Sequence, residues 1–324
     1  MLSRRKFLTA LGALGLPIGL CTCDQGAAPL RIATHVWPGY EFMFLAQREG
    51  LISGEDCELI ETGSATESLA RLAAGEVDGA ALTLDEMLGA RAGGLPLVAV
   101  LIFDISLGAD VLLSKPAIES LPALKGMRIG YEPSAVGALM LHKALDAAGL
   151  GIGEVQPVQL TFDRHADAWA ADTVDALISF EPVVRHLESG GARRLFDSSR
   201  IPDTIFDVLA VMPQALERKS DALKRLIAAH FQVLRDFRKN PNDIAYRMAE
   251  RFRLPAKEVI AAYGGLELPN IYRNRKLLRG PRAPLADTAE ALSRFLLQNG
   301  IMKDAPTDFS GLTDAGLLPR EDDL

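Results

Sequence analysis

The sequence has few of the residues on which disulfide-built folds and common catalytic sites depend. Among 324 residues there are three cysteines, and two of them, Cys21 and Cys23, lie near the N-terminus. The body retains one thiol, Cys57, which has no disulfide partner and which we expect to be a small buried hydrophobe. The five histidines show no H-E-x-x-H spacing, and no G-x-S-x-G elbow occurs. The usual signatures of an enzyme are therefore missing, and we expect no metal and no cofactor.

Long basic runs and membrane-length apolar runs are lacking as well. The net charge is −7, from 35 Lys and Arg against 42 Asp and Glu. This balance argues against a nucleic-acid partner, because phosphate binding requires a basic surface. The densest basic segments, Arg193-Arg194 and 273–282, are interpreted as solvated helix ends. The apolar run 8–20 is too short to cross a bilayer as a helix.

The first residues instead have the layout of an export signal. The twin arginines Arg4-Arg5 precede the apolar run, which favours a twin-arginine signal, with a general secretory signal as the alternative. The run ends in a segment that resembles a lipobox with Cys23 as the lipidated residue; Cys21 fits less well because the bulky Leu20 precedes it. We therefore expect residues 1–22 to be removed. The mature protein would be lipid-anchored, in the periplasm or at the outer face of the cytoplasmic membrane.

The body of the sequence alternates short apolar strands with amphipathic helices. A strand around Leu30–Ala33 is followed by a helix at 41–49, a strand at 57–61, a helix capped by Ser64 and a strand at 77–83. Two strand–helix units that close on a third strand predict a parallel sheet with right-handed crossovers. In such a sheet, ligands bind at the carboxyl ends of the strands.

The same order recurs further along the chain. A strand at 96–103, apolar at nearly every position and so buried on both faces, leads into a crossover at 104–110. The next predicted elements are strands at 127–131, 155–160 and 174–180, helices at 134–148 and 165–172, and a return strand at 204–212. In the helix at 165–172, we expect Ala166, Trp169 and Ala170 to face inward.

The strand at 174–180 (VDALISF) echoes the strand at 77–83 (VDGAALT), which suggests two similar halves. Amphipathic helices at 220–238, from Pro241 and at 285–298 complete the chain. The pattern predicts an α/β protein of two lobes. One is discontinuous, at 31–104 plus 207–324, and the other comprises 105–206.

Several segments together resemble a known family. They are Cys23, 37–41 (WPGYE), 63–67 (GSATE), 75–78 (GEVD), 104–110 and 121–130 (LPALKGMRIG). In order and spacing they are similar to substrate-binding lipoproteins of ABC importers, in the nitrate/sulfonate/taurine branch of the type II periplasmic-binding-protein fold. The resemblance implies two α/β lobes with central mixed sheets, joined by two crossover segments, that close on a small ligand. It also implies an ABC permease and its ATPase as partners.

An enzyme and a regulator are the alternatives. A pyrimidine synthase, or a binding protein related to pyrimidine precursors, would share the fold, but such synthases carry a cysteine-rich patch and the body of this chain has only Cys57. The effector-sensing half of a transcription regulator would need an N-terminal helix-turn-helix, where this chain has the export signal. We therefore expect a binding protein and not an enzyme.

Aromatic and hydroxyl side chains are the first candidates for ligand contacts. Trp37 and Tyr40 follow the first strand in a Pro-Gly loop, where they form a ligand platform or else fold onto the first lobe. The neighbouring His35 is interpreted as a structural histidine. Helix N-termini attract an acceptor or anion, and the candidates there are Ser64, Thr66 and Ser134. For Ser64 and Ser134, the alternative is that each side chain simply caps its own helix.

Further candidates follow the later strands. Thr83 and Asp85 come after the third strand, with Asp85 as a possible N-cap, and Ser179 and Glu181 come after its echo. The floor of the cleft would be formed by Asp104, Ser106 and Asp110 on the first crossover and by Asp207 on the return. Hinge hydrogen bonding is the other interpretation of these four.

The carboxyl groups decide the expected class of ligand. The cleft is predicted to be ringed by Glu41, Asp85, Asp104, Asp110, Glu181 and Asp207. An ionised carboxylate that faces a buried anion is costly, so we discount nitrate and sulfonates as ligands. A ligand with N–H donors or positive charge is favoured, such as an aminopyrimidine, an amide or an amine stacked on Trp37 or Tyr40.

Overall fold

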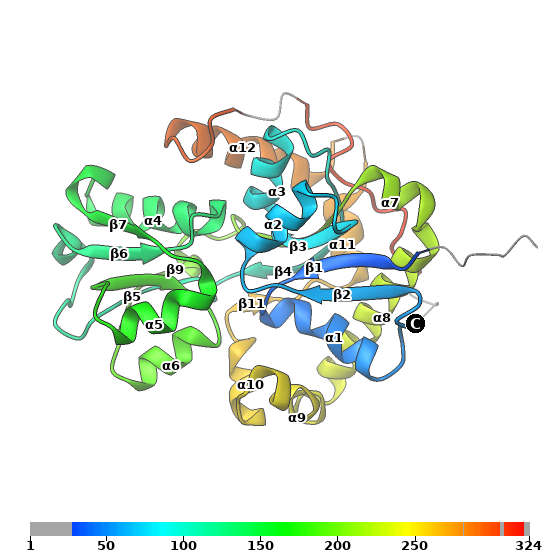
Figure 1. Ribbon diagram of the computed structural model, residues 1–324, viewed down its shortest axis with the longest axis horizontal. Helices are drawn as coiled ribbons and strands as arrows, with labels where there is room; N and C mark the ends of the chain where they lie inside the picture. The colour runs from blue at the N-terminus through cyan, green and yellow to red at the C-terminus, as the bar shows by residue number, and fades with distance from the viewer. Residues whose placement is uncertain (1–27, 281, 305–307, 321–324) are drawn as a thin grey trace, which may run out of the picture.

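Two mixed sheets, joined by two chain segments, form the framework of the protein (Figure 1). The computed structural model describes residues 28–280, 282–304 and 308–320. The predicted export signal, with Cys21 and Cys23, lies outside these ranges. Within them, no helix combines the length and the apolar character needed to cross a membrane.

The first sheet has six strands in the order β11-β4-β10-β3-β1-β2. Strand β1 pairs in parallel with β2 and β3, which confirms the predicted parallel start, and β10 returns antiparallel to both β3 and β4. The short β11 at the edge was not predicted. The strands are β1 (Leu30–Thr34), β2 (Cys57–Glu61), β3 (Gly79–Thr83), β4 (Val98–Ser106), β10 (Phe206–Val211) and β11 (Leu266–Glu267).

The second sheet has five strands in the order β7-β6-β8-β5-β9 and repeats the arrangement of the first. Strand β6 pairs in parallel with β7 and β8, and the arriving strand β5 runs antiparallel to β8, as β10 does to β3. The echo between the sequences of β3 and β8 therefore corresponds to equivalent positions in two sheets. The strands are β5 (Val111–Ser114), β6 (Arg128–Tyr131), β7 (Gln156–Gln159), β8 (Ala176–Ser179) and β9 (Arg193–Asp197).

Strand β9 corrects the interpretation of Arg193 and Arg194 as helix ends. Both arginines lie in this edge strand, where their exposed guanidinium groups bond to Glu119 and Glu188 at 3.0 Å. An exposed edge strand does not require apolar side chains on both faces, so its sequence gave no strand signal.

Helices cover both faces of each sheet (Figure 1). On the five-stranded sheet, α4 lies on one face and α5 and α6 lie on the other. The helices are α1 (Glu41–Arg48), α2 (Ala65–Ala73), α3 (Leu84–Ala92), α4 (Ala135–Ala148), α5 (His165–Ala170), α6 (Val183–Ser189), α7 (Pro213–Arg218), α8 (Ser220–Lys239), α9 (Pro241–Phe252), α10 (Ala256–Ala262), α11 (Ile271–Leu278) and α12 (Pro284–Gln298). Short 3-10 turns are η1 (Pro38–Tyr40), η2 (Leu121–Leu124), η3 (Ile152–Glu154), η4 (Phe162–Arg164) and η5 (Ser198–Arg200).

The inward face of α5 differs from the prediction. Ala166 and Ala170 are exposed, whereas His165 and Ala168 are buried. The helix has only six residues, which is too short for apolar periodicity to identify a face. Elsewhere the apolar pattern is a good guide, since Leu30, Ile32 and Cys57 are all fully buried in the first sheet.

Candidate functional site

A small cavity lies where the carboxyl ends of strands from both sheets meet. Its volume is about 20 Å³, which is room for about one water molecule. The first sheet, its helices and the segments that follow its strands provide six of its lining residues, and the second sheet and its flanking segments provide the other four. The lining residues are His35, Trp37, Ala65, Thr83, Glu86, Asp110, Glu132, Val136, Phe180 and Asp207.

The aromatic side chains that follow β1 are more buried than a loop platform would be. Trp37 is 3% exposed and Tyr40 is fully buried, which agrees with the interpretation that they fold onto the first lobe, although Trp37 also lines the cavity. The Trp37 ring meets Phe180 edge-on at 5.1 Å, and Tyr40 meets Phe103 at 5.0 Å. These contacts join segments far apart in the sequence, so the local pattern could not reveal them.

Two buried aspartates lie beneath these rings, opposite each other on neighbouring strands β4 and β10. Asp104 accepts the indole N–H of Trp37 at 2.9 Å, and Asp207 accepts the hydroxyl of Tyr40. A Cβ at Gly39 would overlap the Asp104 carboxylate, so the Pro-Gly turn lets the chain pass close to this group. Of the two aspartates, Asp207 lines the cavity directly.

The first turn of α3 brings two more carboxyl groups to the site. Thr83 is the N-cap of α3. Asp85, which the sequence offered as a possible N-cap, is instead a fully buried residue of the first turn. The Glu86 carboxylate accepts the backbone N–H of Thr83 at 2.9 Å and lines the cavity. Acidic side chains are favourable at this end of a helix.

Glu132, which the sequence analysis missed, reaches across from the second sheet to the N-terminus of α2. Its carboxylate accepts the backbone N–H of Thr66 at 3.0 Å and the Thr66 hydroxyl at 2.7 Å. The N-terminus of α2 thus has an acceptor at Thr66, and that acceptor is a group of the protein itself. Glu132 follows β6 as His35 follows β1, and that position after a strand could have identified it.

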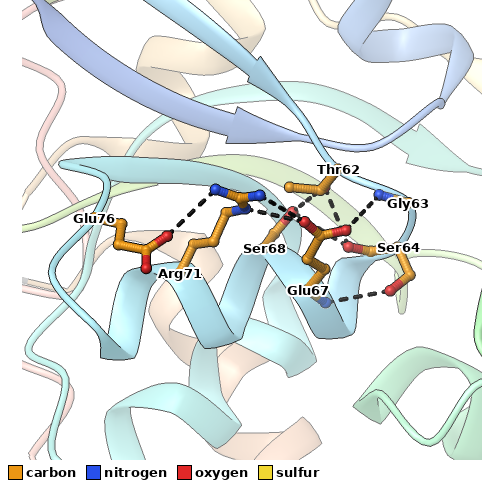
Figure 2. Close-up of polar contacts among 7 residues, drawn as sticks. All are labelled: Thr62, Gly63, Ser64, Glu67, Ser68, Arg71 and Glu76. Carbon is orange, nitrogen blue, oxygen red and sulfur yellow. Dashed lines mark hydrogen bonds and ion pairs between the residues drawn. The ribbon is translucent and has the colours of Figure 1, made fainter.

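Ser64 acts as the N-cap of α2. Its hydroxyl accepts the backbone N–H of Glu67 at 3.2 Å, and Figure 2 shows the Glu67 carboxylate turned toward the N–H of Gly63 and the guanidinium of Arg71. Ser64 is not among the lining residues of the cavity. Ser134 occupies the N-cap position of α4 and is also buried, without a side-chain bond to its own helix.

Serines connect the two segments that join the sheets. The Ser106 and Ser198 hydroxyl groups are 2.7 Å apart, and Ser198 also accepts the backbone N–H of Gly108 at 2.6 Å. Ser106 accepts the N–H of Asp110 at 3.3 Å. Ser106 therefore makes hinge hydrogen bonds, while Asp110 lines the cavity.

Two of the six predicted acidic residues have cationic partners elsewhere. Glu41, the first residue of α1, is bonded to the Arg251 guanidinium, and Glu181 is 3.2 Å from Arg185 in the next helix. Neither lines the cavity. Of the six, Asp110 and Asp207 line the cavity, and its other acidic lining residues are Glu86 and Glu132. Ser179, also predicted, is buried 3.1 Å from His165 and is likewise not a lining residue.

Burial controls the protonation of the groups around the cavity. It raises the pKa of Asp85 and Asp104 to about 7, of Glu86 to about 8 and of Asp110 to about 6. The pKa of Asp207 is raised well above its usual range by burial and by the nearby Asp104. Burial lowers the pKa of His35 to about 4, so its imidazole is neutral at neutral pH. Among the described residues, no Lys or Arg lines the cavity. The site can therefore hold protons and accept hydrogen bonds.

Comparison with known proteins gives one family match and several distant relatives. A model of the family described as NMT1/THI5 like matches residues 38–244. Over 177 residues the chain is 28% identical to an Escherichia coli K12 protein named for the binding of aliphatic sulfonates, a match that covers 54% of this chain and 55% of that one. The chain spans only 42% to 55% of the length of the curated relatives it matches.

Solved structures extend the likeness to most of the chain. The alkanesulfonate-binding protein SsuA from Xanthomonas axonopodis pv. citri, bound to MOPS, has a TM-score of 0.73 at 18% identity and covers 88% of this chain and 96% of its own. The desulfurization enzyme DSZB has a TM-score of 0.62 at 17% identity, with coverage of 89% and 97%. These likenesses establish the type II periplasmic-binding-protein fold that the sequence predicts.

Proposed function

This chain belongs to the NMT1/THI5-like family, and we propose that it is the extracytoplasmic solute-binding component of an ABC importer. It captures a small ligand between two closing lobes and delivers it to a permease driven by an ATPase. The observation that carries this proposal is the cavity to which both sheets contribute side chains from their strand ends. A ligand held there contacts both halves, and so shifts the equilibrium toward the closed form.

The lobes proposed for this motion are 31–104 plus 207–324 and 105–206. The chain passes between them twice, after β4 and before β10, where Ser106 and Ser198 bond to each other. Two adjacent connections restrict the motion to a hinge. Because the cavity admits only about one water molecule, a larger ligand enters when the lobes have separated, which breaks the contact of Thr66 with Glu132.

An anchor at Cys23 would keep the protein beside its permease after export. Labelling with a radioactive fatty acid tests this part of the proposal. Label should be lost in Cys23→Ala and retained in Cys21→Ala. The reverse pattern would move the anchor to Cys21, and label in both variants would exclude both assignments.

Catalysis is the competing function, since the fold also carries an enzyme. Burial raises the pKa of the Cys57 thiol to about 12, which leaves little thiolate to act as a nucleophile. The buried pair of Ser179 and His165 is not part of the cavity wall. A binding role therefore agrees better with the described residues.

The decisive experiment identifies small molecules that remain bound during native purification. They are released by denaturation, identified by mass spectrometry, and returned to ligand-free protein while small-angle scattering follows compaction. We expect a released compound to rebind unchanged and to reduce the radius of gyration. Conversion of the compound to a product would favour an enzyme. Failure of any released or added compound to compact the protein would contradict a closing trap.

A further inference from the structure

The helix N-termini at the cavity already hold carboxylates of the chain itself. At α2, Glu132 accepts both the N–H and the hydroxyl of Thr66. At α3, Glu86 accepts the N–H of Thr83, and Asp85 lies in the same turn. A helix N-terminus attracts an anion through its free N–H groups and its dipole. Because the chain's own carboxyl groups already accept N–H groups at both ends, an incoming anion finds these donors occupied.

Polar atoms without hydrogen-bond partners among the described residues form part of the cavity wall; the Asp110 carboxylate oxygen is an acceptor, and His35 Nδ1 is an acceptor in the tautomer that carries its proton on Nε2. Asp110 Oδ2 and His35 Nδ1 are buried and have no hydrogen-bond partner among the described residues, although both residues line the cavity. Asp110 and His35 are each 5% exposed, so bulk water can hardly reach them to supply the missing hydrogen bonds. A buried acceptor that lacks a donor is costly, and a ligand with N–H groups would satisfy it.

The rest of the wall is apolar or aromatic. Trp37, Phe180 and Val136 line the cavity together with the carboxyl groups. Aromatic ring faces attract cations, and an apolar wall suits a ligand with a small hydrocarbon body. A quaternary ammonium could use the rings but has no N–H to offer Asp110 or His35. A metal ion is less suitable, because the described ranges contain no group of three or more His, Cys, Asp or Glu placed to hold one.

We propose that the cavity binds a small organic cation that carries N–H donors, either a protonated amine or an amidine. Its charged end contacts Asp110, Asp207 and His35, and its hydrocarbon part lies against Trp37 and Phe180. This inference rests on the proposed function, because it specifies the ligand of the same site. It narrows the donor-rich class to molecules that are both charged and able to donate.

Binding of such a cation is linked to the loss of protons. Burial raises the pKa of Asp110 to about 6 and that of Glu86 to about 8, so part of the cluster is protonated near neutral pH. A bound cation stabilises the ionised forms, and its affinity therefore rises with pH; an anion would show the opposite trend. The titratable groups around Asp110 and Asp207 are His35, Tyr40, Asp85, Glu86, Asp104 and Glu132.

Calorimetry on the purified protein at about pH 6 and about pH 8 tests the proposal. The probes are propylamine and benzamidine as donor cations, tetramethylammonium as a cation without donors, cytosine as a neutral donor, and ethanesulfonate and nitrate as anions. We expect a donor cation to bind about tenfold or more tightly at the higher pH, with release of protons to the buffer. Each other class should bind at least about tenfold more weakly.

Variants separate the site from the rest of the protein. Asp110→Asn should weaken binding of the donor cation by about tenfold or more, because it removes the charge and leaves an amide donor in its place. Glu41→Gln is the matched control, since Glu41 is also buried and acidic but is bonded to Arg251 outside the cavity. It should leave the affinity unchanged.

The outcomes distinguish the two proposals. Tighter binding of ethanesulfonate or nitrate, strengthened at the lower pH, would overturn the cationic ligand and leave the transport function in place. Equal binding of cytosine would overturn the requirement for charge, and equal binding of tetramethylammonium would overturn the requirement for donors. If neither a probe nor a natively retained compound compacts the protein, the binding function itself fails and this inference fails with it.

Discussion

Aspartates at the two ends of the parallel strands differ in their partners. At the amino ends, Asp78 accepts the N–H of Arg31 and the ammonium of Lys219, both at 2.7 Å, and Asp175 accepts the N–H and the guanidinium of Arg128, both at 2.8 Å. The same two positions in two sheets carry the same chemistry. At the carboxyl ends, by contrast, the carboxyl groups meet in a cavity whose lining contains no Lys or Arg from the part of the chain that the structure describes.

Pairing with a cation distinguishes aspartates that stabilise the fold from carboxyl groups that line the candidate binding site. A paired aspartate at the amino end hydrogen-bonds to an arginine of the neighbouring strand, and so stabilises the sheet. An unpaired carboxyl in the cavity lowers stability, because burial disfavours its charge. Such a cost is typical of groups retained for binding.

Trp37 is the strongest challenge to this contrast, because it lies at the cavity and yet is buried like a core residue. We expect Trp37→Ala to lower the free energy of unfolding by about 3 to 5 kcal/mol. The loss comes from the ring contact with Phe180 and from Asp104, which no longer receives the indole N–H. Urea denaturation measures it.

Trp37→Phe is the matched control, because it keeps an aromatic ring and removes the N–H donor. Trp37→Phe should lower the free energy of unfolding by less, about 1 to 2 kcal/mol. If Trp37→Ala costs less than about 1 kcal/mol and ligand affinity collapses, the ring is an accessible platform in solution, which is one of the two interpretations that the sequence allows, and the contrast between the two edges becomes sharper.

A matched pair of aspartate variants tests the contrast directly. Asp78→Asn should lower the free energy of unfolding by about 2 to 3 kcal/mol, because a charged acceptor is lost from Arg31 and Lys219. Asp207→Asn should leave it unchanged or raise it by about 1 kcal/mol at alkaline pH, since the amide oxygen still accepts from Tyr40 and no charge is buried. Urea denaturation at about pH 8 gives both values; a larger loss for Asp207→Asn would show that the cavity edge also holds the fold together.

The stability of the ligand-free protein should fall as the pH rises from about 6.5 to about 8. Burial raises the folded-state pKa of Asp85 and Asp104 to about 7 and that of Glu86 to about 8. The folded state therefore binds more protons than the unfolded state, and the stability gained by protonation is lost as pH passes through these values. We expect a change on the order of 2 kcal/mol, measured by thermal and urea unfolding.

Buried histidines limit the pH window of this test. Burial lowers the pKa of His35 and His165 to about 4, so their contribution to stability is present above about pH 6.5 and is lost as the pH falls toward 4. Below about pH 6.5, protonation of the carboxyl groups raises the stability while protonation of the buried histidines lowers it. Glu86→Gln should flatten the slope within the pH window; an unchanged slope would mean that the carboxyl groups titrate normally in solution.

The order of elements and the edge that carries the site could be predicted from the sequence. Apolar runs and Gly or Pro breakers are local signals, and they placed β1 to β3, the long β4 and the returning β10. The rule that ligands gather at carboxyl ends then selected Trp37 and Thr83, and the expected return crossover selected Asp207.

Partners across the fold could not be predicted in the same way. Glu41 and Arg251 are 210 residues apart, and Thr66 and Glu132 belong to different halves of the chain. Whether a carboxyl faces a cation or a cavity depends on such pairs, and no local pattern reports them. For that reason Glu41 was wrongly placed in the site and Glu132 was missed.

Ser64 gives the smallest expected effect, and it concerns a helix end where the N–H groups of Thr66 and Glu67 both have acceptors. We expect Ser64→Ala to lower the free energy of unfolding by about 1 kcal/mol, because the N–H of Glu67 loses its acceptor. Ligand affinity should not change, since Ser64 does not line the cavity. Unfolding in urea and calorimetry with the natively retained ligand provide the two measurements.

Ser64→Thr tests whether the hydroxyl itself is responsible, because threonine is also a good cap and should restore most of the stability. A loss of affinity in Ser64→Ala at unchanged stability would place the hydroxyl on the ligand instead. It would also show that the N-terminus of α2 turns toward the ligand when the lobes separate. Glu132 would then be a competitor for that helix end, and the distinction between a paired edge and an unpaired edge would hold only for the closed form.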